Sequence, residues 1–170
     1  MRVDSYRRRV LDGSCATARS HQVPHVLIAQ AVTTFALTGL IWLVQLVHYP
    51  GFASVDADQF NSFHAMHSTR ITLIVAPLMV VELLASVAWC FDDPRRFTAF
   101  VGLGLVAMIW ASTAFLQVPL HNQLSSGMSA SVIDRLVRTN WIRTLAWSAR
   151  SVLVVTWLLS SLQGHGLERP

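Results

Sequence analysis

Lysine is absent from this chain, and charged residues of any kind are few. Charged side chains make up 13% of the 170 residues, against about 25% in soluble domains. Hydrophobic residues make up 53%, and the 13 basic side chains are all arginine. Because these arginines lie mostly between apolar blocks, we interpret the pI of about 10.0 as a sign of membrane topology and expect no nucleic-acid partner.

Cysteine is scarce as well, since only Cys15 and Cys90 occur. Both fall on the side of the membrane that is predicted to be cytoplasmic, where thiols stay reduced. No disulfide is therefore expected.

Long apolar blocks fill most of the chain. Each approaches the ~20 residues that a helix needs to cross the hydrocarbon core, and strands in lipid would need a closed barrel. The predicted fold is therefore an all-α, single-domain bundle of four transmembrane helices in contact with the lipid bilayer. The expected spans are about 25–48, 70–91, 97–120 and 141–162.

The arginines predict how this bundle is inserted. Eight of them lie in residues 1–24, in the loop at 95–96 or at Arg169. The positive-inside rule then places both termini in the cytoplasm. The expected location is a bacterial inner membrane. We expect a disordered basic tail over 1–24, a cytoplasmic tail over 163–170, and outer helical extensions over about 56–69 and 131–140.

Proline and glycine predict where two of the spans end. Tyr49-Pro50-Gly51 is expected to stop the first helix, and Pro119-Leu120-His121 to end the third. The second helix is expected to run unbroken from about 56 to 91.

Four of the seven histidines fall at one predicted end of the bundle. His48 closes the first span, His64 and His67 lie on the outer extension of the second, and His121 ends the third. Imidazole is the commonest metal ligand, so these four are candidate ligands of Zn, Cu or Fe, or axial ligands of a haem. The alternative is a set of interfacial histidines that meet only water or head groups, with no cofactor.

The last helix carries a polar face. At 100° per residue, Asn140, Arg143, Trp147 and Arg150 fall within an arc of roughly 80°. Such a face suits the bundle interior, where Arg143 could hold a haem propionate or a substrate carboxylate or phenolate. An interfacial aromatic belt would explain Trp141 but not Arg150.

Glu82 is the only acid within an apolar block, near the middle of the second span, and Arg150 lies near the middle of the fourth. Ionisable groups at such depth normally face a partner or a cavity, so we predict that the two are paired. The pair either fixes helix register or acts as a proton relay or substrate anchor. At 1.5 Å per residue His64 lies ~27 Å from Glu82 along one helix, too far to share a metal ion.

Together these residues predict a polar column with histidines at its outer mouth. The leading prediction is a haem- or metal-binding membrane oxidoreductase whose site opens outward. The alternatives are a non-enzymatic binder or carrier of a small molecule or lipid, such as a quinone-like or phenolic compound, and a structural accessory subunit; homo-oligomerisation is left open. The candidate cofactor- or substrate-binding residues are Gln45, Tyr49, Glu82, Gln117, Asn140, Trp141, Arg143, Trp147 and Arg150.

Several blocks resemble a group of uncharacterised bacterial four-span integral membrane proteins. The resemblance covers residues 25–162 and implies the four-span fold but no activity. A more distant similarity, carried by Trp141 and Arg143, is to anthrone-oxygenase-like membrane proteins. It implies oxygenation of a polycyclic phenolic substrate without a metal, but Arg150 falls outside that pattern. The blocks of the first resemblance are residues 42–50, 63–67, 77–82, 116–121 and 139–150.

Overall fold

The structure of the protein is a computed structural model, which describes residues 25–92 and 96–166. Within these residues, four helical segments are long and apolar enough to cross a membrane: His25–Ser54, Ala57–Phe91, Phe97–Leu124 and Ala130–Ser161. The predicted all-α bundle of four membrane-length helices is therefore confirmed. The predicted tail at 1–24 and the end of the tail at 163–170 lie outside the described residues.

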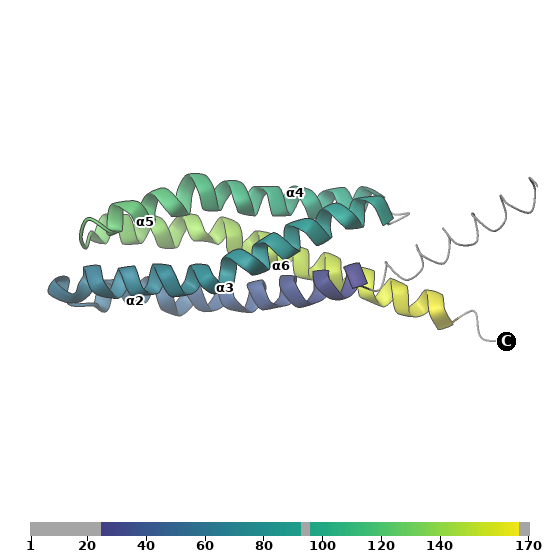
Figure 1. Cartoon of the computed structure of the whole chain (residues 1–170), viewed down its shortest axis with the longest axis horizontal. Coiled ribbons are helices and arrows are strands. Elements are labelled where there is room, and N and C mark those ends of the chain that lie inside the picture. Colours follow the sequence, from purple (N-terminus) through teal and green to yellow (C-terminus); the bar gives the residue numbers. More distant parts are fainter. Residues whose placement is uncertain (1–24, 93–95, 167–170) are drawn as a thin grey trace, which may run out of the picture.

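Both ends of the described chain lie at the same end of the bundle (Figure 1). This follows from an even number of antiparallel spans. The side of the membrane that this end faces stays a prediction, because the arginines of residues 1–24, Arg95 and Arg169 fall outside the described part. The opposite end, near the labels α2 and α5 in Figure 1, is called the histidine end below.

The first span does not stop at Tyr49-Pro50-Gly51, so that prediction is wrong. A helix over 25–43 continues through the π-helical turn η1 (Val44–His48), α2 (Tyr49–Gly51) and the 3-10 turn η2 (Phe52–Ser54). Pro50 lacks an N–H and would clash with the carbonyl four residues earlier in a regular α-helix. The π-turn widens the helix just before the proline, with the Tyr49 N–H donating to the Val44 carbonyl.

The third span repeats this arrangement. It consists of α4 (Arg96–Ser112), the π-turn η3 (Thr113–Gln117) and α5 (Val118–Leu124), and the Val118 N–H donates to the Thr113 carbonyl just before Pro119. The helix therefore continues past the predicted end at residues 119–121. Single π-turns inside helices frequently occur at functional sites.

The other two helices are long and unbroken: α3 (Ala57–Asp92) and α6 (Ala130–Gly166). Pro77 lies inside α3, and α3 changes direction about midway, crossing from the first span toward α4 (Figure 1). Proline is the usual cause of such a bend. Helix α6 packs against α4 and α5.

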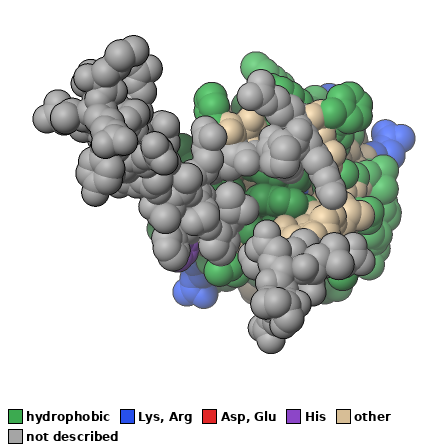
Figure 2. Space-filling view, turned by 90° about the vertical axis from the view of Figure 1, so that its right-hand side faces the viewer, with side chains coloured by type: hydrophobic (Ala, Val, Ile, Leu, Met, Phe, Trp, Pro, Cys, Tyr) green, Lys and Arg blue, Asp and Glu red, His purple; other side chains and the backbone are tan. Residues whose placement is uncertain are grey.

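The bundle interior mixes apolar and polar side chains, whereas the outside is largely apolar. Within residues 25–92 and 96–166, fourteen polar or charged side chains are buried, including Glu82 and Arg150, whereas large apolar side chains such as Leu73 and Phe115 are exposed. Figure 2, which views the bundle from one end, shows apolar side chains around much of its visible perimeter. In lipid this distribution is favourable, because apolar side chains meet acyl chains while polar groups bond one another.

Candidate functional site

The predicted pair of Glu82 and Arg150 is present, with Arg150 Nε 3.0 Å from Glu82 Oε1 and both side chains 1% exposed. Every nitrogen of this guanidinium has a partner. Nη1 donates to the Gly102 carbonyl at 2.6 Å, and Nη2 donates to Gln30 Oε1 at 2.6 Å and to Ser86 Oγ at 3.1 Å.

The Glu82 carboxylate is equally well satisfied. Thr34 Oγ1 donates to Oε1 at 2.9 Å and Trp147 Nε1 donates to Oε2 at 3.0 Å. The network takes residues from all four spans and leaves neither ion unpaired, so a buried charge is neutralised without a ligand. This geometry fits the fixing of helix register better than a substrate anchor.

A second polar layer lies nearer the histidine end. Asn140 Nδ2 donates to Gln45 Oε1 at 2.9 Å, and Gln45 Nε2 donates to the Val137 carbonyl at 3.1 Å. Gln117 Nε2 donates to Thr139 Oγ1 at 3.1 Å. Gln45 and Gln117 each belong to one of the π-turns that precede Pro50 and Pro119. The π-turns that accommodate these prolines therefore also help to position the two side-chain amides.

The four predicted histidines do come together, in two hydrogen-bonded pairs. His48 Nε2 lies 2.7 Å from His67 Nδ1, and His64 Nε2 lies 2.9 Å from His121 Nδ1. His121 also uses its other nitrogen, with Nε2 3.0 Å from the Tyr49 hydroxyl. The four histidines that the sequence places at one end of the bundle thus lie together in the structure, and Tyr49 is hydrogen-bonded to one of them.

Phe52 lies at the centre of these rings, and the sequence reasoning missed it. Its ring, which is fully buried, contacts those of Tyr49 and of all four histidines at centroid distances of 5.1 to 6.3 Å. Phe52 comes three residues after Tyr49, so in a continuous helix the two share one face. A prediction in which the helix continues past Pro50 would therefore have included Phe52.

The histidines surround the Phe52 ring and, in the described part of the chain, do not form a metal-binding arrangement. Within residues 25–92 and 96–166, no group of three or more His, Cys, Asp or Glu side chains has an arrangement that could hold a metal ion. Within the cluster, Nε2 of His67 is buried without a hydrogen-bond partner.

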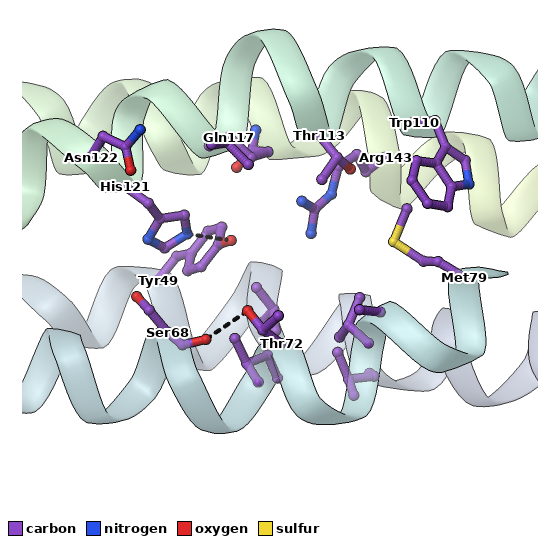
Figure 3. Close-up of a pocket in the computed structure, with 16 residues that line it drawn as sticks. Tyr49, Ser68, Thr72, Met79, Trp110, Thr113, Gln117, His121, Asn122 and Arg143 are labelled. Carbon is purple, nitrogen blue, oxygen red and sulfur yellow. Dashed lines mark hydrogen bonds between the residues drawn. The ribbon is translucent and has the colours of Figure 1, made fainter.

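A cavity of about 360 Å³ lies beside the histidines, between α3 and the third span. Figure 3 shows Ser68 and Thr72 on one side, and Thr113, Gln117 and His121 on the other. Most of the lining is apolar, including Val44, Val75 and Met79. Both the size and the mixture of apolar walls with a few polar groups are typical of ligand sites.

Arg143 reaches into this cavity from α6 (Figure 3). Its side chain is buried, and its Nε has no hydrogen-bond partner. The guanidinium lies 5.7 Å from the Trp147 ring and interacts with the Tyr49 hydroxyl. Neither salt bridge found in the described part of the chain involves Arg143, so its charge is not balanced by a carboxylate there.

Two further polar groups on the cavity wall lack partners. They are the acceptor Oε1 of Gln117 and the donor Nε1 of Trp110, both buried. Buried polar groups in folded proteins are almost always bonded. Together with Nε of Arg143, three such atoms thus belong to residues that line this one cavity.

The remaining predicted residues divide between these sites. Trp147 joins the Glu82 network, and Asn140 holds Gln45. Trp141 is 38% exposed and packs edge-on against Trp42 at 5.6 Å, outside the cavity. Instead of the predicted single column, the bundle holds a closed ionic network around Glu82 and Arg150 and, separately, a cavity that Arg143 lines.

Comparisons of this chain with family models, with curated proteins and with solved structures found no match. The similarities noted from the sequence stay predictions, and function has to be inferred from the site itself.

Proposed function

We propose that this membrane protein binds an amphipathic organic anion in the cavity between α3 and the third span. The anionic group would lie against Arg143, and the hydrocarbon part would lie along Val75, Met79 and their apolar neighbours. The observation that carries the proposal is the buried guanidinium of Arg143 with no carboxylate partner among the described residues.

Electrostatics explains why this arginine points to a ligand. An unpaired charge in a low-dielectric interior costs several kcal/mol, and a chain that spans lipid tolerates one where it faces a partner or cavity. Arg150 on the same helix has its acid within the protein. Arg143 lacks one, so a bound anion would supply the missing charge and accept hydrogen bonds in the planar geometry that guanidinium favours.

The cavity wall limits the chemistry of the ligand. Tyr49, Thr113 and His121 offer hydrogen bonds near Arg143, while the rest of the lining is mostly apolar. A small hydrophilic anion would leave the apolar wall unused. A carboxylate or phenolate with an alkyl or aromatic body fits both parts.

Binding can be tested with three amphiphiles that share one tail: dodecanoate, dodecanol and dodecylamine. Each is titrated into the purified protein in non-ionic detergent while the thermal unfolding midpoint is measured. At 100 times its Kd a ligand stabilises the folded state by about 2.7 kcal/mol, or about 5 to 11 °C for a chain of this size. We expect that saturable shift with dodecanoate, a smaller one with dodecanol and none with dodecylamine.

Arg143→Met should abolish the preference for dodecanoate. Arg138→Met is the matched control, because Arg138 lies on the same helix but is exposed and paired with Asp134. Equal shifts from all three amphiphiles, or a preference for dodecanoate that survives Arg143→Met, would contradict the proposal.

A second candidate is the predicted haem- or metal-binding oxidoreductase, with a transition metal at the histidines. The observation that favours it is the buried, unpartnered Nε2 of His67. Metal analysis and the visible spectrum of the purified protein test it. Metal or haem present in a stoichiometric amount and lost in His67→Ala would favour it over the anion site.

A further inference from the structure

The cavity is open on one side of the bundle. Helix α3 packs against both α4 and α5, and the cavity lies between these contacts, beside the π-turn η3 that joins α4 to α5. Residues of its wall on both sides are exposed on the outside of the bundle: Thr72 and Ala76 on α3, and Val118 and Asn122 on α5. The opening is therefore a gap between α3 and the third span, and it faces the surrounding membrane.

Toward the histidine end, the interior of the bundle is filled by packed side chains. Phe52, Phe60 and Leu124 are fully buried there, and the Phe52 ring packs edge-on against that of Phe60 at 6.1 Å. The His64 ring stacks on Phe60 at 5.8 Å and on His121 at 5.2 Å. These packed rings leave the gap beside α3 as the direct way to Arg143.

The lining of the cavity changes from polar to apolar along the bundle. Figure 3 shows His121 and Asn122 at one end of the cavity, Met79 and Trp110 at the other, and the guanidinium of Arg143 between them. Ser68 and Thr72 add hydroxyls at the polar end. A lipid in the leaflet at the histidine end has the same order, with its polar group outermost and its chain toward the middle of the membrane.

The cavity also has the length of one leaflet. Ser68 and Met79 both line it, and the rise between them along α3 is ~16 Å at 1.5 Å per residue. Half of the hydrocarbon core of a bilayer is about 15 Å. Met79 lies one helical turn before Glu82, which is near the predicted middle of the span. The apolar end of the cavity therefore falls close to the middle of the membrane.

We propose that the anion site takes a single-chain lipid anion, a long-chain carboxylate, sideways from the leaflet at the histidine end. The inference rests on the proposed anion site and adds the class of its ligand and its route of entry. The carboxylate lies against Arg143, the chain runs past Val75 and Met79, and the end of the chain leaves through the gap into the bilayer. The volume of about 360 Å³ is near the lower limit for ligand sites, which suits one chain better than the two of a phospholipid.

An open gap has a consequence that a closed pocket lacks. Acyl chains of the bilayer are as apolar as the side chains of the cavity wall, so a chain that leaves through the gap meets an equivalent environment. The affinity, expressed as the mole fraction of ligand in the membrane, should then hardly depend on chain length. In a closed pocket a chain that is too long would fold back or clash, and the affinity would fall.

Spin-labelled stearate tests the position of the chain. The full-length protein is placed in phosphatidylcholine vesicles at about pH 9, where the carboxyl group is ionised, with a nitroxide either near the carboxylate or near the end of the chain. In electron spin resonance spectra we expect the first label to show an immobilised fraction that Arg143→Met removes, and the second label to show no such fraction. Equal immobilisation of both labels, or an immobilised fraction that does not depend on Arg143, would overturn the inference.

Variants at the gap and a series of chain lengths test the route. Ala76→Phe fills the gap and should weaken stearate binding about tenfold. Ala111→Phe makes the same substitution at an exposed position outside the cavity wall and should change it less than about twofold. If Ala76→Phe does not fold, the saturated carboxylates from decanoate to stearate decide: we expect membrane mole-fraction affinities within about threefold, and a fall of more than about tenfold toward stearate would overturn the inference.

Two further outcomes separate this inference from its neighbours. Phosphatidylglycerol labelled near its glycerol group should show no immobilised fraction that depends on Arg143, and such a fraction would overturn the assignment to a single-chain anion. If dodecanoate stabilises the protein in detergent while labelled stearate shows no Arg143-dependent fraction in vesicles, entry from the leaflet is wrong and the anion site stands. Failure of both measurements contradicts the anion site itself.

Discussion

Arg143 and Arg150 lie two turns apart on one buried face of α6, yet only Arg150 has a carboxylate partner among the described residues. Arg150 is held by Glu82 of α3, the Gly102 carbonyl of α4 and Gln30 of the first span. Arg143 instead meets the Tyr49 hydroxyl, the Trp147 ring and a cavity. The two arginines therefore differ in what they face: Arg150 faces a carboxylate inside the bundle, and Arg143 faces the cavity.

Replacing Glu82 should destabilise the bundle strongly. Glu82→Gln keeps the shape of the side chain but leaves Arg150 uncompensated at 1% exposure, which should cost about 3 to 5 kcal/mol. Equilibrium unfolding in mixed micelles measures this free energy. The double variant Glu82→Gln with Arg150→Met should be more stable than Glu82→Gln alone, because no unpaired charge remains. A double variant that is less stable than Glu82→Gln would refute a structural role for the pair.

Replacing Arg143 should have the opposite effect in the absence of ligand. Arg143→Met removes a buried cation whose Nε lacks a partner, and an unsatisfied buried group costs about 1 to 3 kcal/mol. The variant should be more stable by a similar amount when amphipathic anions are absent. A loss of stability as large as that of Glu82→Gln would show that Arg143 is instead a structural residue.

The sequence was sufficient for the fold and for the Glu82–Arg150 contact. Apolar runs of membrane length can only be helices or barrel strands, and two opposite charges at the same depth have few alternatives to pairing. The 100° periodicity likewise placed Asn140, Arg143 and Trp147 on the buried face. Each of these inferences needs only the pattern along a single helix, or the depth of a residue in the membrane.

The path of the chain around Pro50 and Pro119 was not predictable in the same way. A proline normally ends a helix, and only the register of the π-turns before it lets the helix continue. Phe52 was missed for that reason. The cavity and the unbalanced charge of Arg143 depend on how α3 and the third span separate, which is a property of the packed bundle rather than of any segment.

Gly102 should not tolerate a side chain. A Cβ at this position would lie 3.1 Å from Cζ3 of Trp89 and 3.5 Å from Nη1 of Arg150, and the Gly102 carbonyl accepts a hydrogen bond from that same nitrogen. Overpacking of this kind costs about 1 to 3 kcal/mol, so Gly102→Ala should lower the free energy of unfolding. Gly104→Ala is the matched control, because a Cβ there meets nothing within 4 Å; it should gain up to about 1 kcal/mol of helix propensity. Equal effects of the two substitutions would argue against close packing at Gly102.

Pro77 is expected to hold the cavity open. It lies inside α3 between Ala76 and Met79, which both line the cavity, and α3 changes direction about midway along its length (Figure 1). In Pro77→Ala the regained N–H can complete the helix ladder, so α3 should straighten and the cavity should narrow. Affinity for dodecanoate should fall three- to ten-fold, or by about 0.6 to 1.4 kcal/mol, while the thermal unfolding midpoint without ligand rises. A misfolded variant would lose both stability and binding, so weaker binding together with a higher unfolding midpoint distinguishes a straightened α3 from misfolding. An unchanged affinity for dodecanoate would show that the bend in α3 does not shape the cavity.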